Sequence, residues 1–164
     1  MKQKTKQNII IASLFVGIVA LDQILKAVFT GKNFVLIKGL LSINYQENTG
    51  AAWSIFDGKA TILAIVTILF LLALITFDHF FKGKNTLYAV SFGLILGGAV
   101  GNLWDRLVNT NSQGLHFVKD FIKLDFINFP IFNIADMALT AGVICFAVFF
   151  LFFYAKEEKT NGNN

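Results

Sequence analysis

Few residues of this chain suit disulfide, metal or serine chemistry. Its one cysteine, Cys145, lies deep in an apolar run, so no disulfide can form within the chain. The two histidines, His79 and His116, lack the spacing of zinc ligands, which argues against a two-histidine zinc site. Ser54 and Ser91 have no partner base at a matched depth, which argues against a serine nucleophile. Charge is also scarce, because only 15% of the residues are acidic or basic.

Apolar residues, in contrast, are abundant. They make up 55% of the 164 residues, the mean hydropathy is +0.65, and phenylalanine alone occurs 19 times. A soluble fold of this length could not bury so much apolar surface, because surface takes a large share of a small domain. The composition therefore predicts an integral membrane protein. The net charge of +4 comes with lysines beside apolar runs, which favours contact with anionic membrane phospholipids over contact with nucleic acid.

Four apolar runs are long enough to cross a bilayer, which takes about 20 residues. They cover approximately residues 8–29, 60–81, 87–107 and 134–154. Each must be helical, since backbone groups in lipid need hydrogen-bond partners within the segment. We therefore expect an all-α membrane protein in which residues 1–164 form a single domain, a four-transmembrane-helix bundle with both termini on one side. Lysines are densest beside the termini and in the short turn around Lys82 and Lys84, which favours cytoplasmic termini.

The first connection on the opposite side is much longer than that turn. Residues 30–59 exceed what a link between two helices requires. Within them, residues 34–37 and 40–45 have the composition of short strands, with Gly39 and Asn44 as breakers. We expect a small extracytoplasmic β-sheet on the membrane face. Because the large connections lie outside and the inner turn is minimal, the site of action is predicted at the outer face.

The third span combines small residues with polar ones. Three glycines recur every four residues from Gly93, a spacing that lets helices approach closely in lipid. On another face, Gly98, Asn102 and Arg106 follow one another at the same interval. Polar donors above a glycine cleft suit a helix seam as well as a substrate groove, and the sequence leaves both open. The neighbouring Asp105 could pair with a lysine or cap a loop.

Two further polar groups lie at the borders of spans. Asp22 and Lys26 are one turn apart in the first span, in the order that favours an ion pair. The pair either neutralises two border charges or orients catalytic groups or a lipid headgroup, and in both cases it should face the bundle. The segment from Asn48 through Gly50 to Trp53 is small and polar, then aromatic. Trp53 could anchor it at the interface, and Asn48 could equally hold a substrate backbone.

Asp120 and Asp136 are the strongest candidates for chemistry. Taken alone, Asp120 would be a loop acid, and Asp136 could cap a helix whose N-cap is Asn133. An acid at a membrane border is nevertheless costly, which marks it as a functional-site candidate. The 15 residues between the two acids could return the chain and bring both carboxyls together. A shared proton would then let one acid activate water while the other polarises a scissile carbonyl.

Five blocks along the chain resemble those of the bacterial lipoprotein signal peptidases, the signal peptidase II family. The blocks are Asp22-Gln23-x-x-Lys26, Asn48-x-Gly50-Ala51-Ala52-Trp53-Ser54, Gly97-Gly98-x-x-Gly101-Asn102-x-x-Asp105-Arg106, Val118-x-Asp120-Phe121 and Phe132-Asn133-x-Ala135-Asp136. Each block alone is weakly specific, whereas five in this order, at the edges of four spans, are strongly specific. The resemblance covers nearly the whole chain.

The resemblance implies an aspartic endopeptidase of the bacterial cytoplasmic membrane, with Asp120 and Asp136 as its catalytic dyad. It implies cleavage of prolipoproteins just before the diacylglyceryl-modified cysteine of the lipobox, inhibition by globomycin, and a substrate cradle made by the outer β-structure. Eight positions would bind substrate or support the dyad, namely Asp22, Lys26, Asn48, Gly50, Asn102, Asp105, Arg106 and Asn133. We expect a monomer that needs no cofactor or metal and binds no nucleic acid.

Two other functions remain open from the residues alone. A small proton-coupled transporter would place a carboxylate near the midplane of a helix, often within a repeat. Here the apolar cores of the second and fourth spans hold no acid, and no repeat is visible. A scaffold without chemistry would use every polar residue for packing. Substituting either aspartate separates the three functions, because only a peptidase would lose prolipoprotein cleavage while staying folded.

Overall fold

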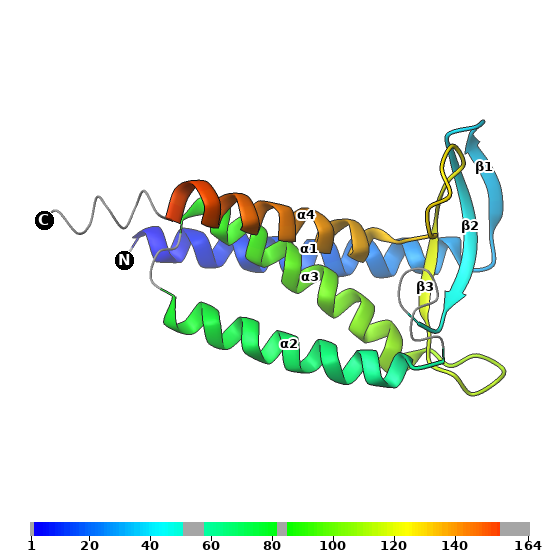
Figure 1. Cartoon of the computed structure of the whole chain (residues 1–164), viewed down its shortest axis with the longest axis horizontal. Helices are drawn as coiled ribbons and strands as arrows, with labels where there is room; N and C mark the ends of the chain where they lie inside the picture. The colour runs from blue at the N-terminus through cyan, green and yellow to red at the C-terminus, as the bar shows by residue number, and fades with distance from the viewer. Residues whose placement is uncertain (1, 51–57, 82–84, 155–164) are drawn as a thin grey trace, which may run out of the picture.

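Figure 1 shows the computed structural model of the chain, which describes residues 2–50, 58–81 and 85–154. Its helices are α1 (Lys2–Phe29), α2 (Ala60–Phe80), α3 (Thr86–Val108) and α4 (Ile134–Val148), and α4 continues into the π-helical segment η2 (Phe149–Tyr154). All four helices are long and apolar enough to cross a membrane. They lie along one another, with the start of α1 at one end of the bundle and the end of α1 at the other.

The helix boundaries agree with the predicted spans except at the start of α1. That helix begins at Lys2, whereas the span was predicted from about residue 8. The prediction followed the apolar run, but the backbone is already helical over the lysines and glutamines that precede it. The other helices begin and end within one residue of the predicted limits, with α4 and η2 taken together. The extra turns of α1 are polar, so they do not move the span itself.

Three antiparallel strands form a small sheet across the opposite end of the bundle from the N-terminus. They are β1 (Asn33–Ile37), β2 (Leu41–Asn48) and β3 (Val118–Leu124), in that spatial order. With this sheet, the predicted fold class is confirmed. Gly39 lies in the β1–β2 turn at φ +74°, a conformation that glycine adopts easily. The prediction that Asn44 breaks the strand was wrong, because Asn44 pairs with Asn33 inside the hairpin and this pairing overrides its low strand propensity.

The third strand is the element that the sequence did not indicate. β3 pairs with β2 in a register that sets Asp120 opposite Gln46. On the other side of β3, the backbone N–H groups of Phe121 and Ile122 donate to the carbonyl oxygen of Phe132. Asp120, expected in a loop, therefore lies on a strand that is hydrogen-bonded along both edges. This arrangement fixes the carboxyl more firmly than a loop would.

α3 is the centre of the bundle and approaches its neighbours through glycines. A Cβ atom on Gly93 would lie 2.9 Å from Leu14 Cβ, and one on Gly97 would lie 2.8 Å from Ile18 Cβ. These distances leave no room for a side chain, so the close contact of α1 with α3 requires glycine. A Cβ atom on Gly98 would collide with the backbone of α4. Of the two alternatives left open for this glycine, the helix seam is therefore confirmed, since α4 fills the space that a substrate groove would need.

β1 forms the free edge of the sheet and carries unusual exposed apolar surface. All five of its residues are exposed, among them the consecutive side chains Phe34, Val35, Leu36 and Ile37. The ring of Phe34 lies 6.3 Å, centroid to centroid, from that of Phe29, the last residue of α1. The sheet therefore continues directly from the end of the first helix.

Candidate active site

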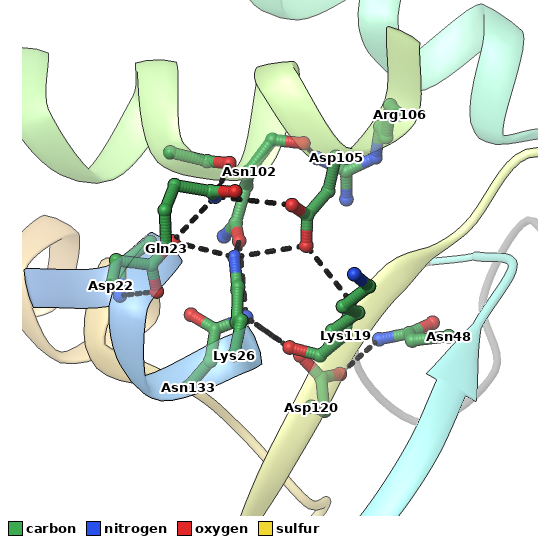
Figure 2. A network of polar contacts seen from close by, with 12 residues as sticks. Asp22, Gln23, Lys26, Asn48, Asn102, Asp105, Arg106, Lys119, Asp120 and Asn133 are labelled. Atoms are coloured by element: carbon green, nitrogen blue, oxygen red, sulfur yellow. Dashed lines mark hydrogen bonds and ion pairs between the residues drawn. The ribbon is translucent and has the colours of Figure 1, made fainter. Parts of the chain in front are cut away.

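A buried ion cluster joins α1 to α3 beside β3 (Figure 2). The ammonium group of Lys26 lies 2.7 Å from Asp22 and 3.1 Å from Asp105, and all three side chains are at most 2% exposed. The predicted pairing of Asp22 with Lys26, and of Asp105 with a lysine, is confirmed. Because isolated charges are costly in such surroundings, each member depends on the others. Lys26 also donates a hydrogen bond to Asn102 Oδ1 at 3.0 Å.

Gln23 completes this cluster, and the sequence gave it no role beyond membership of a block. Its Nε2 atom lies 3.1 Å from Asp22 Oδ2, 3.1 Å from Asp105 Oδ1 and 3.2 Å from the carbonyl oxygen of Gly101. A neutral amide donor between two carboxylates lessens their repulsion without adding charge. The helical spacing of Gln23 from Asp22 and Lys26 was the available signal, because it sets all three on the side that faces α3.

The ion cluster also holds the two elements that carry the candidate acids. Asp22 Oδ1 accepts a hydrogen bond of 2.9 Å from the backbone N–H of Ala135, in the first turn of α4. Asp105 Oδ2 accepts one of 2.9 Å from the backbone N–H of Lys119, next to Asp120 on β3. The cluster therefore ties α1, α3, α4 and β3 together at one place. Asp22 and Asp105 therefore act through backbone contacts next to the acids.

Asp136 both caps a helix and faces the site. Its backbone N–H donates to Asn133 Oδ1 at 2.9 Å, and its Oδ2 accepts from the backbone N–H of Asn133 at 3.1 Å, which makes a capping box at the start of α4. The helix-cap alternative is thus confirmed. It uses one carboxylate oxygen only, and the other, Oδ1, accepts a hydrogen bond of 2.7 Å from Asn102 Nδ2. Capping therefore leaves Asp136 held in one orientation, with a second oxygen turned toward α3.

Asp120 is held by two side-chain amides. Its Oδ1 accepts from Asn133 Nδ2 at 2.7 Å, and its Oδ2 accepts from Asn48 Nδ2 at 2.8 Å. The residue is only 2% exposed. Burial, and after it the nearby negative charge of Asp136, raise the pKa of Asp120 to about 7. A carboxyl with this pKa can hold or release a proton near neutral pH.

Asn133 is the residue on which the two acids converge. Its side-chain amide binds Asp120 and its backbone N–H binds Asp136, so one residue contacts both carboxyls. The same amide nitrogen lies 3.0 Å from Asn102 Oδ1. The two asparagines thereby form a bridge between the acids and Lys26. The structure brings together Asp120, Asp136 and every supporting position named from the sequence.

The segment that follows β2 reaches the site through Asn48 and Gly50. Asn48 Oδ1 accepts from the backbone N–H of Gly50 at 3.0 Å, while the amide of Asn48 binds Asp120. Arg106 makes two long contacts of 3.5 Å, to the carbonyl oxygens of Gly50 and Asn102, and its buried Nε has no partner among the described residues. Arg106 is thus loosely held beside the acids and retains donor capacity. The predicted anchor Trp53 lies outside the described residues.

An apolar cavity of about 850 Å³ opens beside these polar groups. Asn48, Asn102, Arg106, Asp120 and Asp136 contribute to its polar wall. The rest is mostly apolar and includes side chains from α2 and α4, among them Val66, Thr67, Phe70, Met137, Thr140 and Ile144. Sequence reasoning missed these six residues, because an apolar side chain or a lone threonine in a membrane span gives no sign of whether it faces lipid or a cavity. Within the described ranges, no group of three or more His, Cys, Asp or Glu side chains could hold a metal ion.

Comparison with known proteins gives a consistent result across sequence and structure. The sequence model of the family Signal peptidase (SPase) II matches residues 14–152. The lipoprotein signal peptidase of Lactobacillus johnsonii is 38% identical over 159 residues, which cover 94% of this chain and 99% of the relative. That of Caldicellulosiruptor bescii is 42% identical over 140 residues, which cover 83% of this chain and 84% of the relative.

Two solved structures described as bacterial membrane enzymes share the fold. One aligns with a TM-score of 0.77 at 34% identity, covering 92% of this chain and 90% of the other. The second aligns with a TM-score of 0.74 at 36% identity, covering 87% of this chain and 93% of the other. The described helices and sheet therefore have counterparts in known membrane enzymes.

Proposed function

The chain belongs to the signal peptidase II family, whose members cleave signal peptides from prolipoproteins in bacterial lipoprotein maturation, and we propose that it does so as an aspartic endopeptidase with Asp120 and Asp136 as its catalytic dyad. The family assignment makes the chain a membrane peptidase. The aspartic mechanism and the residue roles are our proposal. They depend on the arrangement of the two acids around Asn133.

The contact of one asparagine with both acids is the observation that carries this proposal. Asn133 binds Asp120 through its side chain at 2.7 Å and Asp136 through its backbone at 3.1 Å. Both carboxyls line the same cavity, and the charge of Asp136 acts on Asp120. Two carboxyls this closely linked cannot both ionise easily, so they share a proton. A pair with one proton contains an acid and a base at once.

Such a pair can hydrolyse a peptide bond without a metal or a covalent intermediate. The ionised carboxylate takes a proton from water as the water oxygen attacks the scissile carbonyl carbon, while the protonated carboxyl donates to the carbonyl oxygen. Collapse of the tetrahedral intermediate breaks the C–N bond. The leaving amine takes the proton that the base received from water, and a hydroxyl group of the intermediate returns its proton to the other carboxylate as the new carbonyl forms. The dyad returns to its starting state with one proton.

The cavity supports a substrate that is partly peptide and partly hydrocarbon. We propose prolipoproteins whose lipobox cysteine carries a diacylglyceryl group, with cleavage just before that cysteine. The apolar walls from α2 and α4 suit hydrocarbon. On the polar side, Asn48, Gly50 and Arg106 would bind the substrate backbone, which agrees with the unpaired Nε of Arg106. Globomycin would inhibit by occupying the same polar wall.

We further propose that the enzyme acts as a monomer at the extracytoplasmic face of the bacterial cytoplasmic membrane, with both termini in the cytoplasm. Lys4 and Lys6 lie in the first turns of α1, and lysines beside a span favour the cytoplasmic side. The sheet and the candidate dyad lie at the other end of the bundle. A substrate whose acyl chains stay in the outer leaflet would present its scissile bond at that depth.

Cleavage by purified variants tests the proposed dyad. Asp120→Asn and Asp136→Asn should each abolish release of the signal peptide from a lipidated prolipoprotein, measured by the size of the product. Asp125→Asn is the matched control, because Asp125 binds Ser42 and Lys123 beside the sheet and does not line the cavity. It should cleave at the wild-type rate. Cleavage by either dyad variant would reject the aspartic mechanism, and wild-type cleavage insensitive to globomycin would reject the shared binding site.

A further inference from the structure

The hydrogen bonds around the two acids are not equivalent, and the difference begins at Lys26. An ammonium group can only donate, so the atom of Asn102 that it contacts must be the carbonyl oxygen. This fixes the orientation of the amide, and Asn102 Nδ2 must then point at Asp136 Oδ1, 2.7 Å away. The ammonium group of Lys26 polarises the Asn102 amide, which strengthens the hydrogen bond that the amide donates to Asp136 and favours negative charge on that carboxyl.

Burial disfavours a charge on Asp136, and its other surroundings act against that effect. Its Oδ2 accepts a backbone N–H at the start of α4, where the helix dipole stabilises negative charge. Two cations act on it, Lys26 from α1 and Arg106 from α3. The opposing charge from β3 is Asp120 itself. The carboxylates Asp22 and Asp105 are each paired with Lys26.

Asp120 has less of this support. Its two hydrogen-bond donors are the neutral amides of Asn48 and Asn133, and it lies on a strand, where no helix dipole acts. Burial and, after it, the charge of Asp136 raise the pKa of Asp120 to about 7, although the two amides and Lys26 act against this rise. Arg106 also interacts with Asp120. Of the two acids, Asp120 is therefore the one that retains a proton more readily at neutral pH.

We propose that the relay from Lys26 through Asn102 keeps Asp136 as the ionised member of the dyad, and that Asp120 carries the shared proton in the resting enzyme. This rests on the proposed aspartic mechanism and divides its roles. Asp136 takes the proton from the attacking water, and Asp120 donates its proton to the oxygen of the scissile carbonyl. Lys26 touches neither reacting atom, so it is a positioning residue.

Chemical labelling tests the position of the proton without any need for cleavage. Dicyclohexylcarbodiimide adds to a protonated carboxyl and not to a carboxylate, and it suits an apolar cavity. Treating the intact protein in detergent and mapping the adduct by peptide mass spectrometry should find it on Asp120. Between about pH 6 and about pH 8, either side of its pKa of about 7, the labelled fraction should fall about tenfold. An adduct on Asp136 in place of Asp120 would overturn the assignment.

The more accessible acid is the one expected to stay unlabelled, which makes the result informative. Asp136 is partly exposed, whereas Asp120 is buried. Labelling controlled by access alone would therefore favour Asp136 and contradict the proposal. The test is also separate from that of the proposed function. Cleavage surviving in Asp120→Asn would reject the dyad, whereas an adduct on Asp136 would reject the proton assignment only.

Two asparagine variants give an independent test through the pH profile of kcat/KM. The base sets the acidic limb of the profile and the acid sets the alkaline limb. Asn102→Leu removes the donor to Asp136, so the acidic limb should move to higher pH. Asn48→Leu removes a donor to Asp120, so the alkaline limb should move to higher pH. Each shift should be about one to two pH units, the usual effect of one hydrogen bond to a charged group.

The reverse proton assignment predicts the opposite pattern, so the two variants decide between them. If Asn102→Leu moved the alkaline limb and Asn48→Leu the acidic limb, the proposal would be wrong. Asn8→Leu is the matched control, since Asn8 is exposed on the first turns of α1, far from the site, and its profile should equal that of the wild type. A variant that fails to fold would leave the labelling of the wild-type protein as the deciding measurement.

Discussion

Replacing Lys26 by methionine should strongly destabilise the fold. The substitution keeps the length of the side chain and removes its charge, which leaves Asp22 and Asp105 buried without their cation. Breaking a buried ion pair on one side costs about 3–5 kcal/mol, because the remaining charge stays uncompensated. For a chain of this size, that corresponds to a fall in unfolding temperature of roughly 6–20 °C.

Lys123→Met is the matched control for this measurement. Lys123 forms an ion pair of 3.4 Å with Asp125, so the same atoms are removed from a comparable contact. The lysine is 44% exposed, however, and exposed pairs contribute less than about 1 kcal/mol. Unfolding of both variants would be followed by circular dichroism in one detergent. A fall for Lys26→Met no larger than that for Lys123→Met would refute the reasoning.

A second substitution separates lost charge from lost packing. Adding Asp22→Asn to Lys26→Met removes one of the uncompensated charges, while the asparagine oxygen can still accept the N–H of Ala135. The double variant should therefore recover part of the lost stability. If it were less stable than Lys26→Met alone, the cost would arise from packing and not from an unpaired charge.

Two further predictions concern the helix seam and the dependence of stability on pH. Gly97→Ala should lower the free energy of unfolding by about 1–3 kcal/mol, because its Cβ would lie 2.8 Å from Ile18 Cβ. Gly17→Ala is the control, because a Cβ there would have no atom within 4 Å, and it should leave the unfolding temperature unchanged. Equal effects of the two substitutions would contradict the helix seam. The raised pKa of Asp120 means that the folded state binds the Asp120 proton more tightly than the unfolded state does. The stability gained from this proton is complete below about pH 3.8 and is lost as the pH rises to about 7. Across that pH window, the unfolding temperature of the wild type should fall relative to that of Asp120→Asn, and above it the difference between the two should stay constant. A difference that is the same at every pH would contradict the raised pKa.

The sequence predicted those features that depend on local patterns. Four apolar runs defined the spans, because length and hydropathy suffice for a helix in lipid. The spacing of Asp22 and Lys26, and of Asn133 and Asp136, predicted an ion pair and a capping box that both exist. Each involves residues at most four positions apart. The roles of the two acids in cleavage stay a prediction until variants are measured.

Features that depend on distant partners could not be predicted in this way. β3 forms because it pairs with β2, about 70 residues earlier, and its own seven residues gave too weak an alternation to indicate a strand. Gly98 could have faced a groove or a helix until α4 was placed against it. The apolar wall from α2 was invisible for a similar reason, since residues such as Phe70 look the same whether they face lipid or a cavity.

The exposed strand β1 would restrict the depth at which the protein lies in a bilayer. Four apolar side chains in succession lie between Lys32 and Lys38, and the strand begins just after the first helix ends. A higher position would expose the apolar side chains of the strand to water, and a deeper one would place the ammonium groups of the two lysines among the acyl chains. Only a narrow range of depths avoids both costs. Since β1 is hydrogen-bonded through β2 to the strand that carries Asp120, that range would also set the depth of the proposed dyad in the membrane.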